Sequence, residues 1–195
     1  QDLGQDADSL KALEAAYECH SGADDIGQEL NLRYQAAGLW DKSEAVLASL
    51  YEKNKNQQSL AAQLSHALYM QGKREDALVV CNQALQIGGQ WDVQLLSNRS
   101  MLHAQLGDVG KAKEDAVAAL ALQPDFISAR LNLALAQLGL RELEACVQNC
   151  DWVLAREPEN AAALMNAALA EMEMKQQAQA QLRLKKLLQA YPGHL

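Results

Sequence analysis

Apolar and small residues recur along the chain with a fixed period of 34 residues. The period holds for a column of prolines and for two columns of small residues: Pro124, Pro158 and Pro192; Ala112, Cys146 and Ala180; and Ser100, Ala134 and Ala168. A fixed period of this size is typical of a solenoid, in which each repeat packs against its neighbours. The columns predict units that begin at Val93, Ile127 and Ala161, and a further unit that begins near Gln58.

Each unit has the pattern of two helices joined by a short turn. In the unit from Val93 the first helix carries an apolar stripe made of Leu95, Leu96, Met101, Leu102 and Leu106. Gly107 and Asp108 mark the turn, because glycine adopts the positive φ that ends many helices. The second helix is expected from about Val109 to Leu122, and Pro124 stops it. Small residues at positions 100, 112 and 116 allow the two antiparallel helices to pack closely.

The pattern weakens upstream. The unit from Gln58 aligns if one extra residue lies in the turn at Gly88–Gln90, and a degenerate helix pair is expected around Gly38–Asp41, with Ala45 in the small-residue column. An amphipathic helix from Ser9 to His20, capped by Ser9 and ended by Ser21–Gly22, is expected to cover the open end of the array. The expected ranges are an N-terminal helix in 1–22, the degenerate pair in 23–57, and repeat units in 58–92, 93–126, 127–160 and 161–195.

Composition supports an all-α fold. The chain has 34 Ala and 33 Leu but only 8 Val, 3 Ile and no Thr. Alanine and leucine favour helices, whereas β-branched residues favour strands, so a sheet protein is excluded.

The residues of the unit from Val93 carry a family resemblance. The positions that follow the consensus are Leu96, Ser97, Asn98, Arg99, Ser100, Leu106, Gly107, Asp108, Ala112, Ala119 and Pro124. In this set, and across residues 58–192, the chain resembles the tetratricopeptide repeat (TPR) family. The resemblance implies a right-handed superhelical solenoid of antiparallel helix pairs, with the first helices lining a concave surface that binds a peptide or partner protein.

Charge and motifs exclude several function classes. The formal net charge of −8 and the 5% aromatic content argue against nucleic-acid binding, which needs a basic surface and stacking rings. No apolar run approaches the roughly 18 residues of a membrane span. No nucleophile elbow, phosphate-binding loop, dinucleotide fingerprint or zinc-protease motif is present. We therefore expect no enzyme activity, no catalytic residues and no cofactor.

The cysteines have two interpretations. Cys146 and Cys150 lie four residues apart and therefore share a helix face, where they would form either a metal pair or two buried thiols in the helix seam. Their place in the small-residue columns favours reduced, buried thiols, and no metal site is expected. The chain begins at Gln1, so the sequence leaves both a cytoplasmic and a processed, exported protein open.

Carboxamides form a further column, five residues after each unit start: Gln63, Asn98, Asn132 and Asn166, with Asn31 expected to join them. A carboxamide both donates and accepts hydrogen bonds, so a ladder of them can hold the backbone of an extended peptide. The alternative is that these side chains bond locally between helices. The other residues expected to face the groove are His66, Tyr69, Met70, Gln94, Met101, Leu135, Met165 and Leu169.

Two function classes remain open. The first is a peptide- or protein-binding adaptor, co-chaperone or assembly factor that works through the groove. The resemblance would also suggest chaperone tails as ligands, but Ala62, His66, Ser128 and Asn132 stand where Lys, Arg and Asn side chains would grip such acidic tails, so these ligands are not expected. The second class is a structural subunit held through its outer wall or end helices. A homo-oligomer through the C-terminal helix, rich in leucine from Leu182 to Leu188, belongs to this class.

Overall fold

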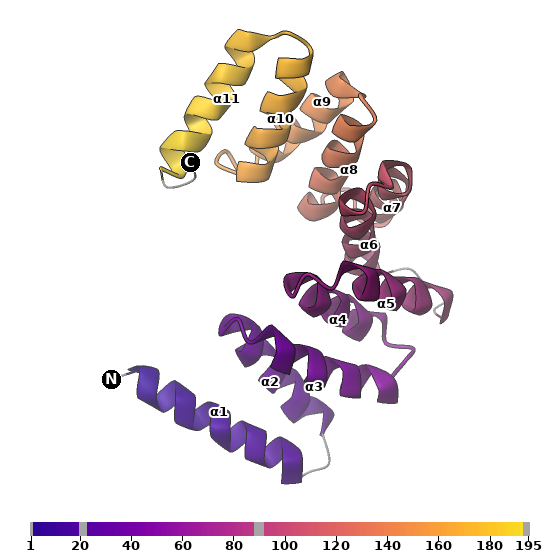
Figure 1. Cartoon of the computed structure of the whole chain (residues 1–195), viewed down its shortest axis with the longest axis vertical. Helices are drawn as coiled ribbons and strands as arrows, with labels where there is room; N and C mark the ends of the chain where they lie inside the picture. Colours follow the sequence, from indigo (N-terminus) through magenta and orange to yellow (C-terminus); the bar gives the residue numbers. More distant parts are fainter. Residues whose placement is uncertain (1, 20–22, 88–91, 193–195) are drawn as a thin grey trace. The chain divides into compact units, whose positions relative to one another are not determined.

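The computed structural model describes residues 2–19, 23–87 and 92–192, and in these ranges the chain forms eleven α-helices and no strand. The N-terminal helix is α1 (Asp2–Cys19). Five helix pairs follow (Figure 1): α2 (Asp24–Ala36) with α3 (Trp40–Lys53), α4 (Gln58–Met70) with α5 (Arg74–Ile87), α6 (Val93–Gln105) with α7 (Val109–Leu122), α8 (Ile127–Gly139) with α9 (Leu143–Leu154), and α10 (Ala161–Glu173) with α11 (Gln177–Ala190).

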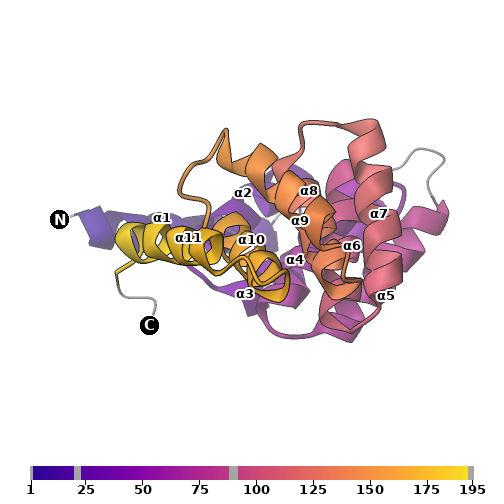
Figure 2. The same ribbon diagram turned by 90° about the horizontal axis from the view of Figure 1, so that it is seen from above.

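The chain is organised as two compact units, Gln1–Asn98 and Arg99–Leu195, and the division falls inside α6. In the first unit the helices pack in chain order, from α1 on α2 to α4 on α5. In the second unit they pack in order from α7 on α8 to α10 on α11, and α8 also contacts α10. Figure 2 shows α8 beside α9 and α10 beside α11 in the second unit. No described helix has the length and apolar content that crossing a membrane requires.

The turn inside each helix pair is three residues long, and one residue of each turn has a positive φ. Gly107 has a φ of 87° at the end of α6, which glycine adopts without strain. The two C-terminal pairs place Arg141 and Lys175 in this conformation instead, each with a φ of 61°. The left-handed conformation costs a residue with a Cβ about 1 kcal/mol. We infer that packing of the helices, and not the preference of the turn residue, sets the turn conformation in these two pairs.

A column of small buried residues forms the seam between the helices of each pair. It lies three residues after the start of the second helix and consists of Ser43, Ala77, Ala112, Cys146 and Ala180. In the third pair the hydroxyl of Ser100 donates to the carbonyl of Ala112 at 2.7 Å. The prediction that Ala45 joins this column is wrong, because Ala45 is exposed and Ser43 occupies the buried position.

The C-terminal thiols belong to the same seam. Cys146 and Cys150 are both fully buried and form no disulfide, so the prediction that these thiols are buried is confirmed. The Cys146 Sγ lies 3.8 Å from the carbonyl oxygen of Asn166, which joins α9 to α10.

The N-terminal helix is longer than the pattern predicted. It begins at Asp2, so Ser9 lies inside α1 and is not its N-cap. Residues 2–9 contain only Leu3 and Ala7 as apolar residues and include a glycine, so the pattern did not predict a helix there. The predicted helix end at Ser21–Gly22 and the extra residue at Gly88–Gln90 lie outside the described residues.

Candidate binding surface

The groove residues expected from the sequence differ in exposure. Met70, Gln94, Leu135, Met165 and Leu169 are exposed, Gln63, His66, Tyr69, Met101, Asn132 and Asn166 are half-buried, and Asn98 is buried. The first unit holds those from Gln63 to Asn98, and the second unit holds those from Met101 to Leu169. Each compact unit therefore carries its own set of groove residues.

The second unit carries the more distinct surface. Leu135 on α8 and Leu169 on α10 occupy the same repeat position and are 37% and 42% exposed, and Met165 is 40% exposed. Asn132 and Asn166 lie three residues before these leucines and therefore on the same helix face. Because α8 and α10 pack against each other, these five residues form one surface, which we call the α8–α10 face.

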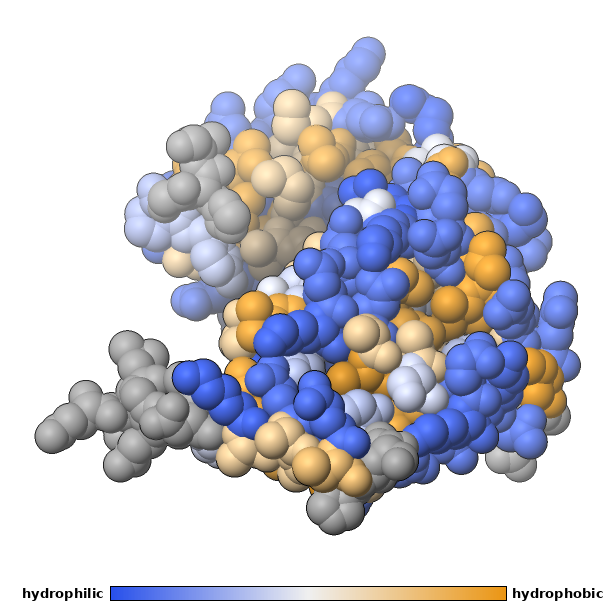
Figure 3. All heavy atoms as spheres, turned by 60° about the horizontal axis from the view of Figure 1, so that its bottom comes forward, coloured by the Kyte–Doolittle hydropathy of each residue, from blue (hydrophilic) through white to orange (hydrophobic). Residues whose placement is uncertain are grey.

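Uncharged side chains dominate this face. The only charged residues of α8 and α10 are Arg130, Glu171 and Glu173. Arg130 is stacked on the Trp152 ring at 4.1 Å, and Glu171 is buried and paired with Arg183. Figure 3 shows apolar side chains lying in patches between hydrophilic ones on the surface it presents. The α8–α10 face is thus suited to an uncharged ligand with apolar side chains and free backbone hydrogen-bonding groups.

The first unit presents aromatic and polar groups on α4. The His66 ring meets the Trp40 ring edge to face, with centroids 5.5 Å apart. Burial lowers the pKa of His66 below its usual value. Sequence analysis missed Trp40, because it was interpreted only as part of the turn at Gly38–Asp41.

Asn98 differs from the other members of the carboxamide column. It is 5% exposed, and its Nδ2 donates to the carbonyl of Ala62 at 2.8 Å and to the Ser65 hydroxyl at 3.0 Å. Its Oδ1 accepts from Gln94 Nε2 at 2.8 Å. Asn98 therefore bonds α6 to α4, as in the alternative that these side chains bond locally between helices.

Asn31 does not extend the column. Counted from the helix starts, it stands seven residues into α2, as Ser65 and Ser100 do in their own helices, and Glu29 holds the column position. Asn31 is buried, and its Oδ1 accepts from the Ser43 hydroxyl at 2.7 Å. Its Nδ2 donates to Gln63 Oε1 at 2.7 Å. Asn31 is thus an interhelix contact, and the prediction that it joins the ladder is wrong.

We expect Asn98→Ala to lower the free energy of unfolding by about 1–2 kcal/mol, because it removes two buried hydrogen bonds that join α6 to α4. Asn166→Ala removes a half-buried carboxamide and should change it by less than about 0.5 kcal/mol. Urea denaturation followed by circular dichroism measures both. Equal losses in the two variants would contradict the distinction.

A polar pair also links the helices of each of the last three pairs. The pairs are His103 with Asp115, Gln137 with Asn149, and Glu171 with Arg183. Asn149 Nδ2 donates to Gln137 Oε1 at 2.8 Å, and Arg183 Nε donates to Glu171 Oε1 at 3.1 Å. The members recur at 34 residues, so the period itself was a signal that sequence analysis did not use.

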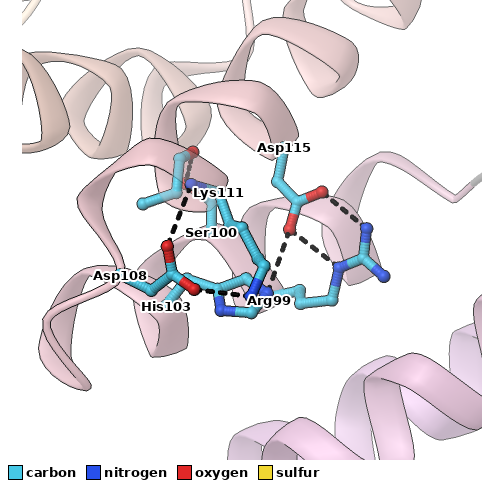
Figure 4. A network of polar contacts seen from close by, with 7 residues as sticks. Arg99, Ser100, His103, Asp108, Lys111 and Asp115 are labelled. Carbon is cyan, nitrogen blue, oxygen red and sulfur yellow. Dashed lines mark hydrogen bonds and ion pairs between the residues drawn. The ribbon is translucent and has the colours of Figure 1, made fainter.

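The first of these pairs is part of a larger network (Figure 4). Arg99 donates from Nε and Nη2 to the two oxygens of Asp115, at 2.7 and 2.6 Å. His103 Nε2 lies 4.0 Å from the same carboxylate. Burial lowers the pKa of His103 although Asp115 acts to raise it. A bidentate guanidinium–carboxylate pair fixes the crossing of α6 and α7 at this point.

Stability should fall as the pH is lowered through about 6.5, the ordinary pKa of histidine. Burial lowers the pKa of His66 and His103 in the folded chain. As the pH falls, the unfolded chain therefore binds protons before the folded chain does, and this favours unfolding. Chemical denaturation at pH 7.5, 6.5 and 5.5 measures the trend. A double variant, His66→Phe with His103→Gln, should show a flatter trend over this range, and an unchanged slope would contradict the assignment.

Among the described residues, no group of three or more His, Cys, Asp or Glu side chains is arranged to hold a metal ion.

Comparison with known proteins places the fold. No protein-family model and no curated protein matches the sequence. Solved structures do match: YrrB, described as a TPR protein with an unusual peptide-binding site, is 15% identical, with 95% of each chain covered and a TM-score of 0.68. A TPR protein from Parabacteroides merdae is 17% identical over 97% of this chain and 75% of its own, with a TM-score of 0.77. MamA from Desulfovibrio magneticus is 16% identical over 88% of this chain and 98% of its own, with a TM-score of 0.71.

These likenesses, together with five helix pairs and no strand in the described ranges, show the all-α solenoid fold of TPR proteins. The fold class and the family resemblance expected from the sequence are confirmed.

Proposed function

We propose that the chain is a non-catalytic protein-interaction module that binds an extended peptide or partner segment on the α8–α10 face. The observation that carries the proposal is the row of exposed apolar side chains on two adjacent first helices, with carboxamides beside them and almost no charge. Each helix pair is proposed to be one repeat unit. The role is that of an adaptor, co-chaperone or assembly factor.

The chemistry of the face defines the ligand. Leu135, Met165 and Leu169 offer apolar contact, and Met165 adapts to side chains of different shape. Asn132 and Asn166 each offer donor and acceptor groups to a peptide backbone. An extended segment with apolar side chains at intervals fits this combination. YrrB, which shares the fold, is described as having a peptide-binding site, and this supports the same class of ligand.

Selection from a random peptide library on the immobilised intact chain tests the proposal. We expect enriched peptides to be uncharged and rich in apolar residues, and to bind the soluble chain in fluorescence polarisation. Enrichment of acidic tails, or no enrichment above an unrelated helical protein, would contradict it.

A structural subunit is the second candidate function. Val117 on α7 and Leu182 on α11 are 49% and 58% exposed on second helices, which form the outer wall in this candidate. Leu188 is also exposed, next to Lys185 and Lys186, so a contact through α11 is the form this candidate takes. Light scattering of the intact chain, with and without Leu182→Glu, tests it. If the parent chain and the variant are both strict monomers, the contact through α11 is contradicted and peptide binding is the remaining candidate function.

A further inference from the structure

A pocket of about 310 Å³ lies between α1, α2 and α3 in the first unit. Its apolar lining comes from Leu30 and Val46, which are both buried, and from the rings of Tyr17 and Tyr34. Its polar lining comes from Glu14, Glu18 and Lys42. We call it the tyrosine pocket. The tyrosine pocket lies in the first compact unit, and none of its residues belongs to the α8–α10 face.

The chain already places an ammonium group in this pocket. Lys42 Nζ lies 2.7 Å from Glu14 Oε1 and 5.5 Å from the centre of the Tyr34 ring. The Tyr34 hydroxyl donates to the same carboxylate oxygen at 2.7 Å. A carboxylate beside an aromatic face is the usual environment for an organic cation in proteins. The Lys42 side chain is more than half exposed, so it can leave the pocket at small cost.

The pocket has further capacity for a cation. The Glu18 carboxylate forms no ion pair with any residue that the structure describes. The Tyr17 hydroxyl is buried and has no hydrogen-bond partner in the described part of the chain. A phenol oxygen accepts hydrogen bonds, and a buried polar group without a partner is costly. A cation that enters the pocket would give the Glu18 carboxylate a partner.

The charge of the first unit points to the same kind of ligand. Residues 1–98 contain 14 Asp and Glu against 7 Lys and Arg, a net charge of −7, whereas residues 99–195 contain 11 against 10, a net charge of −1. Almost all of the net negative charge of the chain is therefore in the unit that contains the tyrosine pocket. A field of this sign attracts basic partners and speeds their association.

We infer that the tyrosine pocket binds a cationic side chain, lysine or arginine, from a basic segment of a partner protein. The cation lies against the Tyr34 ring and pairs with Glu18. When Lys42 swings out, Glu14 becomes a second carboxylate partner. The inference does not rest on the proposed function, because the two sites share no residue.

Titration of the intact chain with N-acetyl-lysine amide and N-acetyl-arginine amide, followed by NMR of the tyrosine rings, tests the inference. Both probes should shift the ring signals of Tyr17 and Tyr34, and uncharged N-acetyl-norleucine amide should not. Equal shifts with the norleucine probe would show a merely apolar cavity, and no shift with any probe would show no site; either result overturns the inference.

Two pairs of variants separate the pocket from general charge attraction. Glu18→Gln should weaken binding of the lysine probe about fivefold, whereas Glu52→Gln, the same charge change on exposed α3 surface, should leave it nearly unchanged. Lys42→Ala should strengthen binding, because it frees Glu14, and Lys55→Ala should not. Equal effects within either pair would overturn the inference, and circular dichroism confirms that each variant keeps its helices.

Discussion

Asp115→Ala is expected to lower the free energy of unfolding by about 3 kcal/mol. Asp115 is buried, and it receives both hydrogen bonds of the Arg99 guanidinium while lying next to His103. Removal of the carboxylate leaves a largely buried positive charge without its bidentate acceptor at the junction of α6 and α7. Urea denaturation followed by circular dichroism measures the loss.

Glu29→Ala is the matched control for this prediction. It removes a carboxylate from an exposed ion pair with Arg33 on the same helix. Pairs of this kind contribute little, so we expect a change of less than about 0.5 kcal/mol. If Asp115→Ala costs no more than Glu29→Ala, the network in Figure 4 does not hold the helix pair together.

The second large effect is expected on binding. The double variant Leu135→Ser with Leu169→Ser should weaken a library-selected peptide at least about tenfold, because both side chains lose apolar area that the ligand would cover. Both leucines are exposed in the free chain, so its melting temperature should change little.

Val117→Ser with Leu182→Ser is the control for the binding prediction. It removes a similar amount of exposed apolar surface from two second helices, α7 and α11. We expect peptide affinity to stay at the parent value. A greater loss of affinity in this variant would move the binding surface to the outer wall and favour the structural-subunit function.

The sequence predicted the starts of the first helices well, at Val93, Ile127 and Ala161, where small buried residues mark the register. Ala112, Cys146 and Ala180 are buried in the seams between paired helices, so small residues recur there with the period of the repeat. In the degenerate first pair no proline marks the register. Ala45 and Asn31 were therefore placed two residues away from the positions that the structure assigns.

The polar contacts were less predictable. Asn98 and Asn166 share a repeat position, yet only Asn98 is buried. Asn98 donates hydrogen bonds to the Ser65 hydroxyl and the Ala62 carbonyl of α4. Periodicity gives the position of a side chain on its helix but not the neighbours that its own unit supplies. For the same reason the sequence could not show that Lys42 and Tyr34 meet at one carboxylate of α1.

NMR of the intact chain with labelled leucine, valine and methionine methyl groups tests the binding face most directly. On titration with a library-selected peptide, we expect the methyl signals of Leu135, Met165 and Leu169 to shift in proportion to the bound fraction, while those of Val117 and Leu182 stay in place. Shifts confined to Val117 and Leu182 would contradict the assignment of the α8–α10 face as the binding surface.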